Sequence, residues 1–204
     1  MIKNILFDMG QVLIRFDQKY FIRRLGIEGE DELLLLREVY RSVEWVQMDR
    51  GSLCEAEAYE KITARLPERL HDAAGKLISM WDRPILEIDG MYELVAELKE
   101  MGYGIYLLSN ASIRQHDYWP RIPASKFFDG KLVSADVHVI KPQPEIYRLC
   151  LEKFGLKAEE CYFIDDAPAN IEGALQCGIA GSVFHDDAAL LRRQLRAAGV
   201  PVRE

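Results

Sequence analysis

The first fifteen residues constrain the fold of this chain most strongly. The apolar run 5–7 stops at Asp8, and Gly10 follows where the backbone must turn sharply or come close to a ligand. A buried parallel strand is typically such a short apolar run, and ligands of parallel sheets bind beyond the carboxyl ends of the strands. We therefore expect Asp8 at the edge of a sheet, facing a ligand crevice. Taken alone, Asp8 is explained equally well as a residue that opens a turn.

The rest of the chain divides into a helical block and an alternating part. Helices are predicted in the block at 17–25, 30–46, 54–66 and 71–81, with Ser52 or Cys54 beginning the third. After Pro84, strands are predicted at 103–108, 161–164 and 182–184, between helices at 91–101, 113–119, 143–154, 169–177 and 188–198. This pattern predicts an α/β fold, a doubly wound parallel sheet with an inserted all-helical cap. We assign residues 1–15 and 85–204 to the core and residues 16–84 to the cap.

Acidic residues follow two of the predicted strands. Asp8 follows the first, and the pair Asp165-Asp166 follows another. Three crowded carboxylates repel one another unless a cation neutralises them, and Mg²⁺ prefers oxygen ligands, including carboxylates and substrate phosphate. The sequence therefore predicts a magnesium site at this edge of the sheet, with Asp8 placed to attack phosphorus and form an aspartyl-phosphate.

Phosphate ligands are expected from the same strand ends, because hydroxyl groups, backbone N–H groups and a lysine all bind phosphate oxygens. The candidates are Met9, Gly10, Ser109, Asn110 and Lys141. Each part also has an ordinary explanation. Ser109-Asn110 is common turn chemistry, Lys141-Pro142 is a typical solvated lead-in to a helix, and Asp165-Asp166 suits a helix cap. Their joint order at successive strand ends favours the functional interpretation.

Four segments of the chain resemble the four motifs of the haloacid dehalogenase-like hydrolase superfamily, most of which are magnesium-dependent phosphatases. They are residues 7–13, 107–110, 141–147 and 163–171, and the helical block resembles the small cap of that family. The resemblance implies a Rossmann-like core. It also implies that Asp8 is the nucleophile and a metal ligand, that Asp166 binds the metal directly, and that Asp165 binds it through a water. Ser109 and Asn110 would bind phosphate, and Lys141 would be the neutralising lysine. Asn170 would support the acidic loop.

Gly10 departs from the usual pattern of that family. Its phosphatases usually carry a second aspartate two residues after the nucleophile, which acts as general acid and base. The carbonyl of Gly10 can still bind metal, but the proton-transfer group is missing. A sub-branch of small bacterial sugar-phosphate phosphatases, including glucose-1-phosphate phosphatases, resembles this chain in having that glycine. We therefore predict a Mg²⁺-dependent phosphatase that acts on a small phosphorylated metabolite, with a sugar phosphate as the expected substrate.

The missing aspartate predicts a preference for substrates with stable leaving groups, such as anomeric, acyl and aryl phosphates, over sugar 6-phosphates. Gln11 is a candidate for orienting the attacking water, as a glutamine does in some GTPases. The alternative is that a residue of the cap supplies the proton, in which case the leaving group matters little.

Two other functions fit parts of the sequence. A haloacid dehalogenase also uses an aspartate nucleophile without the second aspartate, but such enzymes need no metal, so the pair Asp165-Asp166 counts against it. A non-catalytic phosphate-binding or partner-binding protein fits the loss at Gly10. The retained Asp8, Lys141 and Asp166 count against that alternative.

Substrate recognition is expected from the cap segment 45–52. It offers an aromatic face at Trp45, a flexible contact at Met48, and polar groups at Asp49 and Arg50. The alternative is that Trp45 belongs to the core of the cap and that Asp49 and Arg50 form a solvated pair.

Composition limits the partners. The net charge of −7 argues against a general role on nucleic acids or membrane surfaces, and the longest aliphatic run, 33–36, is too short to span a bilayer. The four cysteines show no CxxC spacing and indicate reduced thiols, so we expect a cytoplasmic protein. The sequence does not indicate an oligomeric state.

Overall fold

The computed structural model describes residues 1–203 and is built on one five-stranded sheet. All neighbouring strands are parallel, and their order across the sheet is β3-β2-β1-β4-β5. The strands are β1 (Asn4–Phe7), β2 (Gly104–Ser109), β3 (Gly130–Val133), β4 (Cys161–Asp165) and β5 (Ala180–Val183). The doubly wound parallel sheet predicted from the sequence is confirmed, and its central strand is the apolar run that stops at Asp8.

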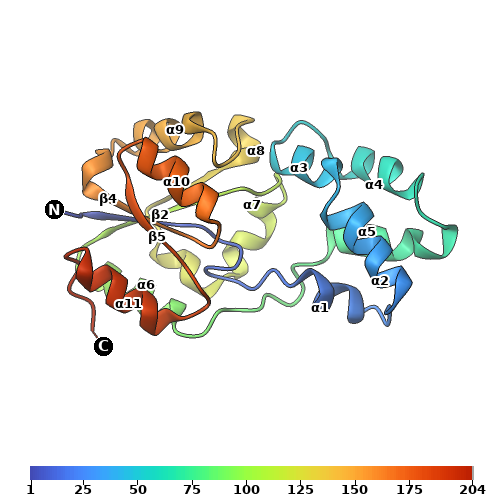
Figure 1. Ribbon diagram of the computed structural model, residues 1–204, viewed down its shortest axis with the longest axis horizontal. Coiled ribbons are helices and arrows are strands. Elements are labelled where there is room, and N and C mark those ends of the chain that lie inside the picture. Colours follow the sequence, from blue (N-terminus) through green and yellow to red (C-terminus); the bar gives the residue numbers. More distant parts are fainter. Residues whose placement is uncertain (204) are drawn as a thin grey trace.

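Helices cover both faces of the sheet because successive side chains of each strand point to opposite sides. Ile5 and Phe7 pack in one cluster with α6 (Met91–Glu100) and α11 (Ala188–Ala197). Leu6 packs in a second cluster with α9 (Pro144–Phe154) and α10 (Pro168–Gln176). In Figure 1 the first pair of helices lies below the sheet and the second pair above it.

The chain leaves the sheet after β1 and forms a helical block before it returns through α6 to β2. This block lies at the right of Figure 1 and has an apolar cluster of its own. Its elements are α1 (Gln18–Arg23), α2 (Glu30–Leu35), the π-helical turn η1 (Leu36–Tyr40), α3 (Val43–Asp49), α4 (Glu55–Thr63), the 3₁₀ turn η2 (Glu68–Leu70) and α5 (His71–Ser79). We refer to residues 16–84 as the cap, with the boundaries proposed from the sequence.

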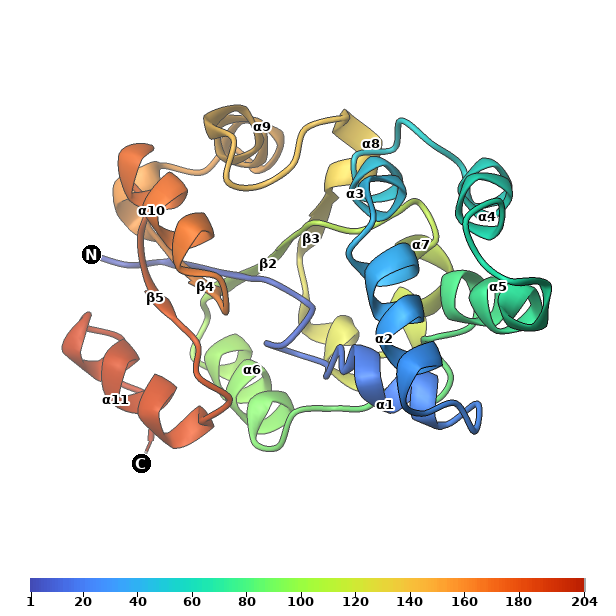
Figure 2. The ribbon, with the colours of Figure 1, turned by 45° about the vertical axis from the view of Figure 1, so that its right-hand side comes forward.

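The two segments that join the cap to the core run side by side. The backbone N–H of Arg15 donates to the carbonyl of Leu86 at 2.7 Å, and the N–H of Ile88 donates to the carbonyl of Leu13 at 3.2 Å. The cap also rests on the core further away, where α3 lies beside α8 (Ser134–Val137), as Figure 2 shows.

The remaining core segments are short. They are α7 (Gln115–Tyr118), η3 (Trp119–Arg121), η4 (Pro123–Phe127) and η5 (Ala158–Glu160). All four cysteines are free, as the sequence suggested. Among the helices described for residues 1–203, none is both long enough and apolar enough to cross a bilayer.

Several elements differ from the sequence prediction, and the short helix α8 is one that was not predicted. The single helix expected at 30–46 is broken, because Ser42 accepts a hydrogen bond from the N–H of Trp45 and starts a new helix, α3. Strand β3 was not predicted, since only Leu132 and Val133 of its four residues are buried and its sequence has no apolar run.

Candidate active site

The polar residues that follow β1, β2 and β4 meet at one edge of the sheet. These three strands are neighbours and run in the same direction, so their carboxyl ends lie together. Asp8 follows β1 directly, Ser109 is the last residue of β2, and Asp165 is the last residue of β4. All three side chains are buried. The fold thus brings together residues more than 150 positions apart in the chain.

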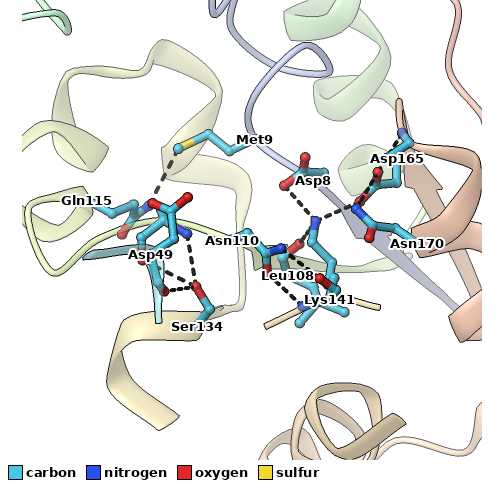
Figure 3. Close-up of polar contacts among 12 residues, drawn as sticks. Asp8, Met9, Asp49, Leu108, Asn110, Gln115, Ser134, Lys141, Asp165 and Asn170 are labelled. Atoms are coloured by element: carbon cyan, nitrogen blue, oxygen red, sulfur yellow. Dashed lines mark hydrogen bonds and ion pairs between the residues drawn. The ribbon is translucent and has the colours of Figure 1, made fainter. Parts of the chain in front are cut away.

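Lys141 links the two buried carboxylates, as Figure 3 shows. Its Nζ lies 2.9 Å from Oδ1 of Asp8 and 2.6 Å from Oδ2 of Asp165, and it donates to the carbonyl of Leu108 at 2.9 Å. Burial opposes the charged form of Lys141, but the two carboxylates outweigh burial and raise its pKa. Lys141 is therefore a fixed positive charge beside Asp8.

Asp8 has the properties of a nucleophile. Burial raises the pKa of its carboxyl group to about 6, the charge of Lys141 opposes this, and the charge of Asp165 adds to it. Asp8 is thus largely ionised at neutral pH. Its Oδ1 is buried and, although close to Lys141, accepts no hydrogen bond of good geometry within the described part of the chain.

The three carboxylates fit a hard divalent cation. Asp8, Asp165 and Asp166 each offer an oxygen, and these oxygens lie within 4.8 Å of one another. Both oxygens of Asp165 already accept hydrogen bonds, from the N–H of Ala167 and the amide of Asn170, and one also binds Lys141. The free acceptor capacity lies at Asp8 and Asp166. An all-oxygen set with two available carboxylates suits Mg²⁺, which keeps several waters.

Ser109 and Asn110 differ in how their side chains are used. The Oγ of Ser109 is buried and has no hydrogen-bond partner among residues 1–203. Asn110 accepts from the backbone N–H of Lys141 at 2.8 Å and donates to the carbonyl of the same residue at 3.0 Å. The hydroxyl of Ser109 is therefore not used by the described part of the fold, whereas the amide of Asn110 holds the Lys141 backbone in place.

A cavity of about 220 Å³ opens over these residues, between the core and the cap. Asp8, Met9, Gly10, Asn110 and Asp166 line it from the core. The cap contributes Phe16, Trp45, Met48, Asp49, Ile78 and Trp81. Three of the four cap residues proposed from the sequence thus face the cavity, and Arg50 is not among its lining residues.

The aromatic wall of the cavity was only partly foreseen. Phe16 and Trp81 stand at the two ends of the cap, and their rings make an edge-to-face contact with centroids 4.8 Å apart. Tyr118 of the core adjoins Trp81 at 5.1 Å. Trp45 was predicted from the sequence to contact the substrate, whereas Phe16 and Trp81 were not. Aromatic residues at both boundaries of an inserted helical block were the available signal.

Gln11 lines the cavity, but its side-chain carbonyl is already used. Its Oε1 accepts the backbone N–H of Phe16 at 2.7 Å, and its backbone is left-handed, with φ of 57°. This contact holds the turn that leads from β1 into the cap. The expectation that Gln11 orients a water gains no support from this arrangement.

A family model for haloacid dehalogenase-like hydrolases matches residues 2–178, which is most of the chain. The chain belongs to this family of hydrolases. The resemblance identified from the four sequence motifs is thereby confirmed.

Several known proteins are similar to this hydrolase. Flavin mononucleotide hydrolase 1 of Arabidopsis thaliana is 26% identical over 167 residues, which cover 82% of this chain and 66% of that protein. A phosphorylated carbohydrates phosphatase of Thermotoga maritima is 24% identical over 178 residues, covering 86% and 81%. The chain spans about two thirds or less of several other curated relatives.

The fold is also found in solved structures. A family enzyme of Bacteroides thetaiotaomicron, solved in complex with magnesium and inorganic phosphate, has a TM-score of 0.70 and 24% identity. The alignment covers 94% of this chain and 99% of that one. This likeness extends over the cap as well as the core.

Proposed function

We propose that this chain is a Mg²⁺-dependent phosphatase that hydrolyses a small phosphorylated metabolite through an aspartyl-phosphate at Asp8. One observation carries the proposal. The ionised Asp8 lies beside the buried cation of Lys141, in a group of three carboxylates whose oxygens lie within 4.8 Å of one another. This arrangement provides a nucleophile, a fixed positive charge and the ligands of a hard metal ion at one end of a cavity.

The residues around Asp8 have separate tasks in this mechanism. The carboxylate of Asp8 attacks phosphorus, and the bond from phosphorus to the leaving oxygen breaks. Lys141 balances the negative charge of nucleophile and phosphoryl group, and the free hydroxyl of Ser109 donates to a phosphoryl oxygen. Asp8, Asp166 and the carbonyl of Gly10 would hold Mg²⁺, which when bound would neutralise charge on the phosphoryl group.

The cavity favours a small substrate with an apolar face. Its volume of about 220 Å³ is below the roughly 300–1,000 Å³ of sites for drug-sized ligands. Trp45 and Trp81 offer aromatic rings on the cap side, and sugar rings and small organic groups pack on such surfaces. The similarity to the Thermotoga maritima phosphorylated carbohydrates phosphatase supports a sugar phosphate as the substrate class.

The test is hydrolysis of an aryl phosphate and of a panel of sugar phosphates by the purified chain. We expect EDTA to abolish the activity, and Mg²⁺ to restore it. The variant Asp8→Asn should lose at least about 1,000-fold, because it lacks the nucleophile. Asp72→Asn is the matched control, since Asp72 is an exposed aspartate of the cap that pairs with Lys76, and its activity should be unchanged.

Two results would replace the proposal. Release of halide from a haloacid in the presence of EDTA would indicate a dehalogenase. Binding of inorganic phosphate without hydrolysis of any phosphate ester would indicate a non-catalytic phosphate-binding protein.

A further inference from the structure

We propose that the carboxyl group of Asp49 is the general acid and base of this enzyme, supplied by the cap because the chain has glycine at position 10. The inference rests on the proposed phosphatase function and assigns the proton-transfer step of the same site. It selects, from the two alternatives left open by the sequence, the one in which the cap provides the proton.

Few other side chains that line the cavity could act as the general acid and base. Its titratable side chains are those of Asp8, Asp49, Tyr118 and Asp166. Asp8 is the nucleophile and Asp166 a metal ligand in the proposed mechanism. Burial raises the pKa of Tyr118 well above its ordinary value, so its phenol is a poor proton donor at neutral pH. Asp49 is the titratable group that has no other task.

Asp49 is placed opposite the nucleophile. It is the last residue of α3 and lines the cavity from the cap, while Asp8 and Gly10 line it from the core. None of the ion pairs formed among residues 1–203 includes Asp49. Its carboxyl group is therefore not neutralised by a cationic side chain among these residues.

The surroundings of Asp49 favour a carboxyl group that holds a proton near neutral pH. Its pKa is raised to about 7, chiefly by burial and also by the negative charge of Asp8. The N–H of Ser112 and the charge of Lys141 act in the opposite direction. A group with such a pKa can both give and take a proton under working conditions.

A hydrogen-bond relay fixes Asp49 relative to the core, as Figure 3 shows. The Oγ of Ser134 donates to the backbone carbonyl of Asp49 and accepts from the N–H of Ala111 at 3.0 Å. Ala111 lies in the loop that begins with Asn110, directly after Ser109 at the end of β2. The same hydroxyl thus ties the cap segment to the phosphate-binding loop, with Asp49 at the junction.

The residues after Asp49 also sit tightly on the core. The carbonyl of Arg50 lies 3.2 Å from Nδ1 of His138. At Gly51, where φ is +72°, a Cβ atom would lie 2.3 Å from the carbonyl oxygen of Ala135. The segment 49–51 therefore packs directly against α8 and against His138, which follows it. Proton transfer requires a side chain whose position is held by such contacts.

The proposed reaction balances in two steps. In the first, Asp8 attacks phosphorus, the bond to the leaving oxygen breaks, and that oxygen takes the proton of Asp49. In the second, water attacks the phosphorus of the aspartyl-phosphate and gives a proton to the Asp49 carboxylate, and the bond from phosphorus to Asp8 breaks. Inorganic phosphate leaves, and both aspartates return to their starting states.

The decisive measurement compares wild type with Asp49→Asn on phosphate esters of graded leaving-group acidity. Wild type should show a shallow dependence of kcat/KM on leaving group. In Asp49→Asn, kcat/KM should change little for 4-nitrophenyl phosphate but fall by about 100-fold or more for alkyl and sugar phosphates. The exposed Asp72→Asn should behave as wild type. Wild type without any phosphatase activity would refute the proposed function, which is a separate outcome.

A second readout follows the covalent intermediate. Without its base, Asp49→Asn should hydrolyse the aspartyl-phosphate slowly, so kcat falls on every substrate and the phosphorylated protein accumulates. Intact-mass spectrometry after rapid quenching detects this adduct, which the double variant Asp8→Asn/Asp49→Asn should lack.

Rescue gives the strictest test. A Cβ atom at position 10 would meet nothing nearer than Cβ of Phe16 at 4.0 Å, so Gly10→Asp introduces no clash at its Cβ atom. Adding Gly10→Asp to Asp49→Asn should flatten the leaving-group dependence again. An equal loss on all substrates in Asp49→Asn, without adduct and without rescue, would show that Asp49 only binds substrate or supports the fold, and would overturn the proposal.

Discussion

At the scale of single residues, the side chain of Ser109 has different effects on stability and on the proposed function. Its hydroxyl is buried without a partner among the described residues, at the end of β2, the strand that pairs with β1. A buried polar group that lacks a hydrogen bond costs about 1–3 kcal/mol. A bound phosphate oxygen would satisfy this hydroxyl, which otherwise weakens the fold.

Ser109→Ala is therefore expected to leave the unliganded protein equally stable or more stable by about 1 kcal/mol, while kcat/KM falls about 10- to 100-fold. The stability is measured by urea unfolding and the activity with an aryl phosphate. Ser182→Ala is a matched control, because Ser182 of β5 also has a buried hydroxyl without a partner, but β5 is an edge strand that does not neighbour β1, whereas β2, which ends at Ser109, does. A clear loss of stability in Ser109→Ala with unchanged activity would contradict this interpretation.

The positions of single residues could be predicted where strand ends determine them. Asp8 and Asp165 meet because β1 and β4 are parallel neighbours whose carboxyl ends share one edge, whereas Lys141 reaches them from the segment before α9. The use of amide side chains could not be predicted. Asn110 bonds to the backbone of Lys141, and Gln11 to the backbone N–H of Phe16, and both contacts depend on turn geometry that the sequence does not specify.

At the scale of elements, the end of α3 matters most. The apolar periodicity of 30–46 predicts one helix, but Ser42 donates to the carbonyl of Val39 at 2.8 Å and caps α3. This local bonding redirects the chain, so that Trp45 and Asp49 reach the cavity. A polar residue that competes for backbone hydrogen bonds overrides periodicity here. The helical content of the cap could therefore be predicted, but the direction of its third helix could not.

The close contact at Gly51 gives a prediction for this element. Gly51→Ala places a methyl group against the backbone of Ala135, so the segment 49–51 must move away from α8. We expect kcat/KM to fall more for alkyl phosphates than for 4-nitrophenyl phosphate, as in Asp49→Asn.

Gly26→Ala is the control for Gly51→Ala. Gly26 has nearly the same backbone angle, φ of +74°, but a Cβ atom there would have no neighbour within 4 Å. Both variants carry the cost of a left-handed alanine, about 1 kcal/mol, and only one carries the clash. Equal kinetics in the two variants would show that the contact with Ala135 does not position Asp49.

At the scale of the whole molecule, the relation of cap to core depends on contacts between residues far apart in sequence. The sequence predicts both units, because each has its own periodicity and apolar cluster. It does not predict how they meet. Asp49 and Ser134 are 85 positions apart, and no local pattern relates them.

A buried carboxylate of the cap, paired with two arginines of the core, also connects the cap to the core. The side chain of Asp82, in the segment that follows α5, is fully buried. Arg114 and Arg121 of the core both donate to its carboxylate. Burial opposes ionisation of Asp82, but the hydrogen bonds from the two arginines outweigh it and lower the pKa of this carboxyl group. The charge of Asp82 therefore stabilises the folded protein.

We expect Asp82→Asn to lower the free energy of unfolding at pH 7 by about 3 kcal/mol, because two arginines lose their charged partner. The exposed control Asp72→Asn should lose about 0.5 kcal/mol or less. Since the pKa of Asp82 is lower in the folded than in the unfolded protein, its contribution is complete above the ordinary value of 3.8 and disappears as pH falls through the folded pKa. Urea unfolding of wild type and Asp82→Asn should therefore give curves whose difference shrinks in acid. A difference that stays constant down to about pH 2, or one as small as that of the control, would mean that packing rather than charge holds this connection.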